Sequence, residues 1–460
     1  MRTPKIAAIA ATSAVLIALA ACSGPSVGGS GGDGTAKADT STKSNPVDTS
    51  TCTNKIQDAK APVVTMWSWS PTAQVAVDAF NAAHHDVQIC WTNAGAGADE
   101  YNKFSTAIAA GKGAPDVVML ETEVLTSFEI KNALVDLAPY DTKGELEKAF
   151  GAGTLKDISQ GGDVYAVPDD GGPVALMYRK DIFDQYGLTV PKTWDEYAAD
   201  AQKLKDAGGP LIGDWPADTP AFTQAMFNQK GAKTFDYRLA DKTKLGLDVD
   251  NAPSVQVLQY WQDLVDKKLV STAGQSTTDF TSALVGGQLA TMIAPSWEPG
   301  HLVSAGIKPG ADSPWRVAPL PQWKAGDDVQ VNWGGSTYAV TSQAVSKKLA
   351  AEVAIGIFAH ETPTTIGAHF PLHLEAQKAS WFQGANDPFF GNQASNKEVW
   401  IPAASGYKGA VYSPFQPYYE AQLIQALGKV IPGDQTPKQA LGALQKDISS
   451  YAQKQGFQVK

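Results

Sequence analysis

Short apolar runs alternate with helix-length amphipathic stretches in the first third of the folded sequence. We expect strands at 62–67, 87–91 and 116–120, each a nearly unbroken apolar run, with helices at 71–84 and 100–110 between them. Unbroken apolar strands that alternate with helices are typical of a parallel sheet covered on both faces. The pattern therefore predicts an α/β fold that begins near Pro62.

The alternation recurs with changes further along the chain. Shorter strands are expected at 163–168, 174–178, 290–293 and 317–320, and helices near 343–361 and 436–455. Thr193 and Glu196 have the spacing of a capping box, which predicts another helix after Thr193. The helical 3–4 spacing of the apolar residues around Trp261 assigns that indole to packing, and we interpret Trp91 and Trp194 in the same way.

The N-terminus has the pattern of an export signal. Arg2 and Lys5 precede a small-residue apolar run, 6–21, which is too short to span a bilayer stably. The run ends in Leu19-Ala20-Ala21-Cys22, which resembles the lipobox of bacterial lipoproteins. That resemblance implies a signal peptide over 1–21, cleavage before Cys22 and a palmitate-type lipid on its thiol. Residues 22–50 then form the lipidated end and a Gly/Ser/Thr-rich linker with almost no large apolar side chain.

Two cysteines remain on an exported chain, where disulfides persist. Cys52 lies just before the first expected strand and Cys90 ends the second, so neighbouring strands bring them within reach. A bond between them stabilises the fold by roughly 4 kcal/mol in the chain-entropy model. Two separate buried thiols are the alternative interpretation.

Composition narrows the class of partner. The chain has 460 residues and 43% of them are hydrophobic, which excludes wholesale disorder. Its 37 basic and 47 acidic side chains give a formal charge of −10, which argues against nucleic acid as a partner. The 12 Trp residues indicate either an extensive core or a surface on which ligands stack.

Aromatic and acidic residues gather where the expected strands end. Open α/β sheets bind ligands outside the carboxyl ends of their strands. Indole planes cover the apolar face of a sugar ring, and carboxylates accept hydrogen bonds from its hydroxyls. The residues placed there are Trp67, Trp69, Glu121, Asp169, Asp170, Trp297 and Glu298, together with Trp333, Gly334 and Gly335 at a strand start.

With these pieces the chain resembles the extracellular solute-binding proteins of family 1, the maltose-binding-protein-like lipoproteins of sugar ABC transporters. The resemblance covers residues 60–450 and is carried by the segments 114–118, 165–168, 177–181, 191–194 and 287–292, with Trp297 after the last. It implies an α/β, two-lobed periplasmic-binding-protein-like fold of type II. A cleft between the lobes holds the ligand, and a hinge crosses between them several times.

The resemblance also implies lobe boundaries and ligand contacts. The N-terminal lobe comprises 51–167 and 322–365, the C-terminal lobe comprises 168–321 and 366–460, and the crossings lie near 166–171, 319–323 and 362–374. Trp297 matches the family's stacking tryptophan, and the acidic position after the third strand is Glu121 or Glu123. Trp215, Tyr412, Phe415 and Tyr418 are expected on the second lobe's wall. At the first crossing the acidic residue of maltose-binding protein aligns nearer Gly172, so maltose does not follow as the ligand.

Several alternatives stay open at this level. Trp67 and Trp69 alternate along an extended segment, so we expect at most one to stack on a ligand while the other packs. Asp169 and Asp170 before Gly171 also fit a turn. Paired carboxylates beside aromatics describe glycoside hydrolases as well. His369 and His373, or Tyr418 and Tyr419, are weak candidates for metal ligands, and a peptide is a further non-sugar solute.

We therefore expect a monomeric binding protein without a cofactor and without enzymatic activity. Its ligand is an oligosaccharide, which it hands to the permease of an ABC transporter. The lipid on Cys22 places it at the extracellular face of the bacterial cell membrane.

Overall fold

The computed structural model describes residues 47–460 except 71–72 and 360–369. The chain divides into two compact units, Met1–Lys37 and Ala38–Lys460, and the first lies outside the described residues. The expected signal peptide, Cys22 and nearly all of the expected linker also lie outside the described residues. Within the described part of the chain, no helix has the length and apolar character needed to cross a membrane.

A five-stranded sheet is built from the first three expected strands and two later ones. Its strand order is β2-β1-β3-β14-β6. β1, β2 and β3 are parallel, as expected, whereas β14 runs antiparallel to β3 and to β6. The strands are β1 (Val63–Trp67), β2 (Gln88–Thr92), β3 (Val117–Glu121), β6 (Val167–Pro168) and β14 (Ser336–Val340).

Helices cover both faces of this sheet, which explains why its strands have no polar alternation. Along β3, Val118 and Leu120 pack with Tyr101 and Phe104 of α2 (Ala98–Ala109), and with α3 (Leu125–Glu129). Val117 and Met119 point the other way, into the cluster formed with α1 (Ala73–Ala83) and α12 (Lys347–Phe358). Every second residue of β3 therefore belongs to a different core.

The later strands form a second sheet, of order β12-β7-β13, in which all pairs are antiparallel. It comprises β7 (Val174–Arg179), β12 (Thr291–Pro295) and β13 (Trp315–Pro319), near the expected positions. Pro295 at the end of β12 pairs with Val174 at the start of β7. The expectation that ligands bind outside the carboxyl ends of the strands does not apply to this antiparallel sheet, because the end of one strand lies beside the beginning of its neighbour.

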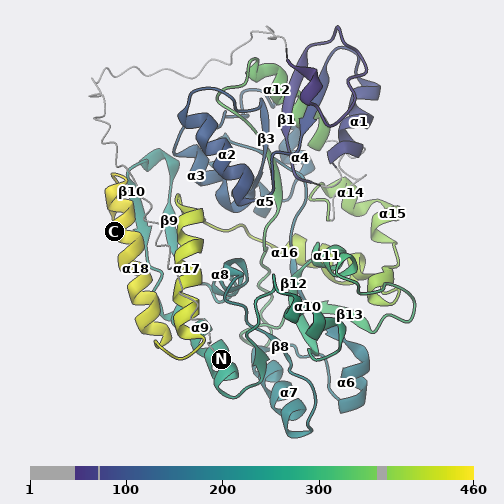
Figure 1. Cartoon of the computed structure of the whole chain (residues 1–460), viewed down its shortest axis with the longest axis vertical. Helices are drawn as coiled ribbons and strands as arrows, with labels where there is room; N and C mark the ends of the chain where they lie inside the picture. Colours follow the sequence, from purple (N-terminus) through teal and green to yellow (C-terminus); the bar gives the residue numbers. More distant parts are fainter. Residues whose placement is uncertain (1–46, 71–72, 360–369) are drawn as a thin grey trace, which may run out of the picture. The chain divides into compact units, whose positions relative to one another are not determined.

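Long helices pack against one another, and two of them carry buried indoles. The helices in this group are α7 (Trp194–Asp206), α8 (Pro220–Gln229), α9 (Ala252–Asp266), α17 (Gln416–Val430) and α18 (Pro437–Lys454) (Figure 1). Trp194 and Trp261 are fully buried and lie edge to face at 5.7 Å, which confirms their assignment to packing. Thr193 and Glu196 form the expected capping box at the start of α7.

Shorter elements complete the described chain. The helices are α4 (Glu145–Ala149), α5 (Ala152–Asp157), α6 (Lys180–Tyr186), α10 (Thr278–Val285), α11 (Glu298–Ser304), α14 (Leu374–Lys378), α15 (Ser380–Gln383) and α16 (Ile401–Gly406), with single turns η1 (Thr49–Thr51), η2 (Thr122–Val124), η3 (Leu239–Asp241), η4 (Pro388–Phe390) and η5 (Asn396–Trp400). The strands are β4 (Ser159–Gln160), β5 (Asp163–Val164), β8 (Gly213–Asp214), β9 (Phe235–Tyr237), β10 (Lys244–Leu247), β11 (Val270–Ser271) and β15 (Gln458–Val459).

A disulfide joins Cys52, which follows η1, to Cys90 in β2, and their Cα atoms are 5.0 Å apart. Of the two interpretations of these cysteines, the structure contains the bonded one. The bond fixes the first described residues to β2, which is an edge strand of the five-stranded sheet.

Three stretches of chain lie side by side between the two sheets. The Asp169 amide donates to the Ser336 carbonyl and the Trp333 amide to the Gly172 carbonyl, each at 2.9 Å. The Gly171 amide donates to the carbonyl of Phe370 at 2.9 Å. The stretch paired with the first crossing is thus 331–336, further along the chain than the expected 319–323. Part of the third expected crossing, 362–374, lies outside the described residues.

Candidate functional site

Glycines let an indole and a carboxylate approach each other at the centre of the molecule. Trp297, at the start of α11, donates from Nε1 to the Trp333 carbonyl at 3.2 Å. A Cβ on Gly172 would overlap that carbonyl oxygen and lie 3.0 Å from Trp297 Nε1. A Cβ on Gly334 would lie 3.6 Å from the same nitrogen and 3.9 Å from Glu121 Oε1. The structure therefore places Trp297, Gly334 and Glu121 together.

The backbone conformation of two neighbouring glycines also requires the absence of a side chain. Gly334 and Gly335 have φ angles of +67° and +135°, and both precede β14 directly. Residues with a Cβ rarely adopt such angles. A Cβ on Gly335 would lie 3.2 Å from the Asp170 carbonyl oxygen, so the pair keeps this connection close to the first crossing.

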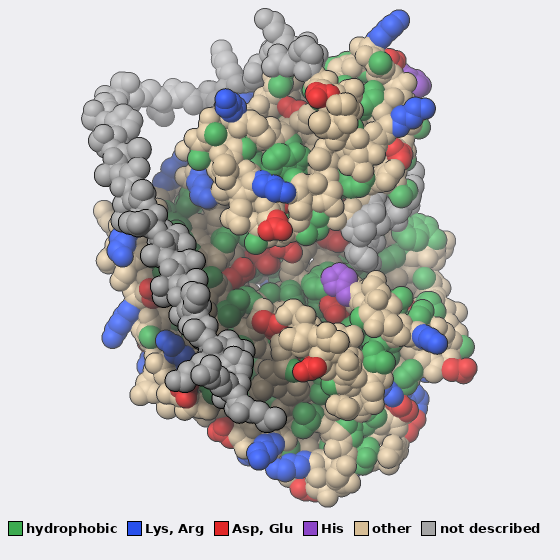
Figure 2. Space-filling model, in the orientation of Figure 1, with side chains coloured by type: hydrophobic (Ala, Val, Ile, Leu, Met, Phe, Trp, Pro, Cys, Tyr) green, Lys and Arg blue, Asp and Glu red, His purple; other side chains and the backbone are tan. Residues whose placement is uncertain are grey.

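Carboxyl groups from three separate parts of the chain surround this centre. Glu121, at the end of β3, accepts from the Tyr101 hydroxyl at 2.8 Å. Asp170 accepts from the Ser336 amide at 2.8 Å, and Glu420 on α17 accepts from Gln416 Nε2 at 2.9 Å. Figure 2 shows acidic side chains gathered in a hollow across the face of the molecule. The site therefore offers many hydrogen-bond acceptors and little positive charge.

Burial and mutual repulsion raise the pKa values of carboxyls in this cluster. Burial raises the pKa of Glu121 and Asp170 adds to the effect, although the Tyr101 hydrogen bond opposes it. The pKa of Asp169 lies well above its ordinary value because of burial and then Asp170. Burial raises the pKa of Glu420 to about 7. A protonated carboxyl donates a hydrogen bond as well as accepting one, so the cluster can pair with both roles of a hydroxyl.

The alternative acidic position after β3 belongs to the same cluster. The pKa of Glu123 is raised well above its ordinary value by burial, then by Glu121 and Glu420, while a hydrogen bond from the Gly334 backbone opposes the shift. Sequence reasoning left Glu121 and Glu123 as alternatives, and the structure brings both to the cluster.

Glu298 lies one residue beyond the indole, in a different environment. Burial and then Asp214 raise its pKa to about 8. Its Oε2 is 3.9 Å from Nδ1 of His301, whose ring lies 5.2 Å from the Trp297 ring. Glu298 thus flanks the indole on the side of α11.

Two expected ligand-binding tryptophans are buried. Trp215 has no exposed surface and stacks beside Trp261 at 6.5 Å, so its assignment to the wall of the cleft is wrong for this structure. Trp333 is 8% exposed and packs edge to face against Phe222 at 6.2 Å. Its contribution to the centre is the carbonyl oxygen that Trp297 binds. Both indoles are held by apolar neighbours that come from distant helices, which no local pattern reveals.

Trp67 and Trp69 have different surroundings because β1 ends at Trp67 and Trp69 lies beyond the strand; within a strand, residues two apart point to the same face. Trp69 packs edge to face against Tyr101 at 5.7 Å, and Tyr101 binds Glu121. Trp67 instead lines a shallow hollow beside α2, with Lys103 and Lys112 among its neighbours. Of the two tryptophans, Trp69 is therefore the one that contacts Tyr101, a residue bound to the acidic cluster.

The C-terminal segment supplies residues from Tyr412 to Glu420. The pKa of Tyr412 is raised well above its ordinary value by burial, then by Asp157 and Glu123. Phe415 is 8% exposed and packs against Tyr451 and Phe457 at 5.2 and 4.9 Å. Of the residues expected on the wall of the second lobe, Tyr412 thus lies near the acidic cluster, and Phe415 lies in an aromatic group with Tyr451 and Phe457.

Sequence reasoning missed Tyr101, Gln416 and Glu420. Tyr101 is a buried residue of an ordinary amphipathic helix, and Glu420 lies in the first turns of α17. Glu420 lies almost three hundred residues after Glu121 in the sequence, so no local spacing of residues predicts that the two carboxyl groups meet.

The metal alternatives gain no support from geometry. Among residues 47–460 as described, no group of three or more His, Cys, Asp or Glu is placed to hold a metal ion. Tyr419 is fully buried against Phe235, whereas Tyr418 is partly exposed and binds Asp447, so the two rings do not converge. His369 lies outside the described residues, and Nε2 of His373 is 3.0 Å from the Ala359 carbonyl oxygen.

Comparison with known proteins adds a family and several relatives. Residues 67–354 match the family model described as bacterial extracellular solute-binding protein. The arabinooligosaccharide-binding protein of Bacillus subtilis (strain 168) is 26% identical over 261 residues, which cover 55% of this chain and 58% of that protein. The lactose-binding protein of Rhizobium radiobacter is 26% identical over 416 residues, covering 84% and 94%.

A solved structure is similar over most of the chain. It is the ABC transporter associated binding protein from B. animalis subsp. lactis Bl-04, in complex with β-1,6-galactobiose. The sequence identity is 27%, the TM-score is 0.72, and the match covers 87% of this chain and 100% of that one.

Proposed function

Because the chain belongs to the bacterial extracellular solute-binding proteins, we propose that it captures an oligosaccharide at the centre formed by Trp297, Gly334 and Glu121 and delivers it to an ABC transporter. The relatives named above bind arabinooligosaccharide, lactose and β-1,6-galactobiose, and one of them is associated with an ABC transporter. These proteins are binding proteins, so we assign no reaction to the carboxyl pair Glu121 and Asp170.

The observation that carries the proposal is the approach of an indole to a carboxylate across a glycine. A sugar ring has an apolar C–H face and a rim of hydroxyls. The partly exposed Trp297 offers a plane for that face, and Glu121 and Asp170 offer acceptors for the rim. Glycine at 334 keeps the space between Trp297 Nε1 and Glu121 Oε1 free of a side chain.

The lobe boundaries and the anchoring of the chain belong to the same proposal. A ligand that contacts both the end of β3 and the start of α11 touches two different sheets, which favours a closed state. The lobes we propose are 51–167 with 322–365, and 168–321 with 366–460, except that the boundary expected at 321/322 moves to 331–336, where the chain pairs with the first crossing. We also propose that lipid on Cys22 holds a monomeric body at the extracellular face of the bacterial cell membrane.

A thermal-shift screen of the purified protein tests this function. The panel contains arabino-, galacto- and malto-oligosaccharides and lactose, with peptides, polyamines and divalent metal ions alongside. A ligand at 100 times its dissociation constant stabilises the native state by about 2.7 kcal/mol. We expect a shift with one saccharide class and no release of reducing ends. A response to peptides or metal ions alone contradicts the proposal.

Substitution of Trp297 tests the site. Trp297→Ala removes the stacking plane, so we expect the affinity for the responding saccharide to fall by more than about tenfold while the fold is retained. Trp381→Ala is the matched control, because that indole is 51% exposed and lies outside the centre. Calorimetric titration measures the affinity, and circular dichroism checks the fold. Normal binding by Trp297→Ala removes the residue from the site.

A further inference from the structure

A second cavity begins where the acidic cluster ends. It has a volume of about 520 Å³ and lies between α2 and α3 on one side and the ends of α17 and α18 on the other. Tyr101 belongs to both places, since it lines the cavity and its hydroxyl binds Glu121. The volume is in the range of roughly 300–1,000 Å³ that is typical of small-ligand pockets.

The two walls of the cavity are each tied to the acidic cluster by hydrogen bonds. On one wall, Ser127 accepts from the Gln416 amide at 3.1 Å. The Gln416 side chain in turn donates to Glu420, whose pKa is raised by burial and then by Glu121. Tyr101 on one wall, and Gln416 beside the other, therefore connect the lining of the cavity to the acidic cluster through hydrogen bonds.

The lining has the mixed chemistry that sugar rings require. Tyr418 and Tyr451 stack on each other at 3.8 Å and form an aromatic platform, and Phe128 and Phe457 add apolar surface. Hydroxyl and amide groups stand between these rings, from residues such as Ser105 and Gln455. Aromatic planes with interspersed polar groups suit a ring that is apolar on its face and polar on its rim.

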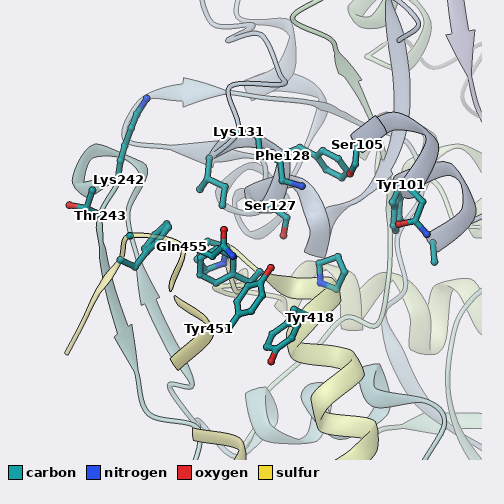
Figure 3. A pocket seen from close by; sticks show the side chains of 18 residues that line it. Tyr101, Ser105, Ser127, Phe128, Lys131, Lys242, Thr243, Tyr418, Tyr451 and Gln455 are labelled. Atoms are coloured by element: carbon teal, nitrogen blue, oxygen red, sulfur yellow. The ribbon is translucent and has the colours of Figure 1, made fainter. Parts of the chain in front are cut away.

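The acidic cluster lies beyond one end of the cavity, and the charged side chains that line the cavity itself are Lys131 and Lys242. Figure 3 shows Tyr101 at one end of the lining and Lys242 with Thr243 at the other, with Tyr418 and Tyr451 between them. Lys131 also lines the cavity, with Nζ 5.1 Å from the centre of the Phe128 ring, and burial lowers its pKa. The end near Glu121 thus accepts hydrogen bonds, whereas the far end presents ammonium donors.

From this continuity we infer that the cavity is an extension of the ligand site, which holds the distal units of a saccharide of three or more units while another unit lies at Trp297. The inference rests on the proposed function and deepens it, because it assigns the ligand a length. A disaccharide at the centre leaves the cavity to water, whereas a longer chain replaces that water with ring contacts.

Blocking the cavity tests this assignment. Ser105 is half-buried on α2 and lines the cavity, so Ser105→Trp fills it from that wall. Thr106→Trp is the matched control, because Thr106 is the next residue of the same helix and is exposed outside the cavity. Tyr418→Ala is a second variant, which removes half of the platform instead of filling the space.

The measurement is calorimetric titration with di-, tri- and tetrasaccharides of the arabino- and galacto- series. In the wild type and in Thr106→Trp, we expect a trisaccharide to bind at least about tenfold more tightly than the disaccharide of its series. In Ser105→Trp and Tyr418→Ala this gain disappears, while the disaccharide affinity is kept. Equal affinity for all lengths in the wild type overturns the inference but leaves the proposed function intact. An unchanged gain in both variants also overturns it, and if no saccharide of any length binds, the proposed function fails as well.

Discussion

At the scale of single residues, the centre depends on what glycine omits. Gly172 faces the Trp333 carbonyl, which is the acceptor for Trp297 Nε1. A methyl group there meets backbone, which cannot rotate away as a side chain does. One missing Cβ therefore fixes the position of an indole that lies more than a hundred residues further along the chain.

Gly172→Ala is expected to displace the Trp333 carbonyl and with it Trp297. We expect a loss of about 1–3 kcal/mol in the free energy of unfolding, as for other overpacked sites, and weaker saccharide binding. Gly428→Ala is the control, because a Cβ on that residue of α17 meets nothing within 4 Å. Alanine is the better helix former, so the control is expected to gain about 0.5–1 kcal/mol. Urea denaturation and titration with saccharide give both quantities, and identical behaviour of the two variants contradicts the steric argument.

The raised carboxyl pKa values predict that stability falls as pH rises. The folded protein keeps a proton on Glu420 up to a pKa of about 7, whereas the unfolded chain releases it near the ordinary value of about 4.3. Between these values the native state binds more protons, so each such carboxyl lowers the free energy of unfolding by up to about 1.4 kcal/mol per pH unit.

We therefore expect a higher melting temperature at pH 5 than at pH 8. Glu420→Gln cannot ionise, so it is expected to reduce the slope between about pH 4.3 and pH 7. Glu147→Gln, on the exposed side of α4, is expected to keep the slope of the wild type. Calorimetric melting across this range measures the effect, and equal slopes in all three proteins contradict the raised pKa of Glu420.

Which residues sequence reasoning finds depends on their local context. Glu121 ends β3 and Trp297 lies two residues after the end of β12, so the sequence pattern places both near the end of a strand. Tyr101 and Glu420 lie within helices, where nothing distinguishes them from other amphipathic positions. Trp215 was assigned wrongly because the resemblance to a family does not tell whether this tryptophan faces the cleft or the core, and here it is fully buried.

At the scale of elements, hydrophobic pattern predicts strands and helices better than it predicts strand direction. β3 and β12 are both buried along their lengths. Yet β3 runs parallel to β1, while β12 runs antiparallel to β7. Burial on both faces gives the same apolar run in either case, so direction depends on the connections between strands. The antiparallel second sheet was for this reason not readable from the run alone.

The capping box of α7 is an element-scale feature that both sequence and structure contain. Thr193 Oγ1 accepts from the Glu196 amide at 3.2 Å, and Glu196 Oε2 accepts from the Thr193 amide at 3.2 Å. Thr193→Ala leaves one helix donor without a partner, so we expect a loss of about 1 kcal/mol in the free energy of unfolding. Gln202→Ala, at an exposed position of the same helix, is expected to change it little. Equal losses in the two variants, measured in urea, rule out a specific contribution of the cap.

At the scale of the whole molecule, the sequence predicts the class of fold because local and global signals agree. The parallel strands β1 to β3, the helices between them and the capped α7 each follow from local pattern, and together they restrict the chain to an α/β architecture. The pairing of 169–172 with 333–336 and 370–372 joins stretches far apart in sequence. Such pairing has no local signature. For this reason the second of the three stretches was expected at 319–323, earlier in the chain than 331–336, where the structure has it.

The disulfide is expected to stabilise the whole described unit. It closes a loop with a sequence separation of 38 residues, for which the chain-entropy model gives about 4 kcal/mol. The double substitution Cys52→Ala with Cys90→Ala, and separately reduction of the wild type, are each expected to lower the melting temperature. A reductant is expected to leave the doubly substituted protein unchanged, and a further fall in its melting temperature contradicts this account.

The same bond has a mechanical consequence. Tension applied to the residues before Cys52 passes through the sulfur atoms to Cys90 and so enters the fold at the edge strand β2. Residues 53–89, which include β1 and α1, lie inside the closed loop and carry none of that load. When the folded unit is pulled by the residues before Cys52, it therefore cannot unfold residue by residue from that end, because the first element under force is a strand held in the sheet.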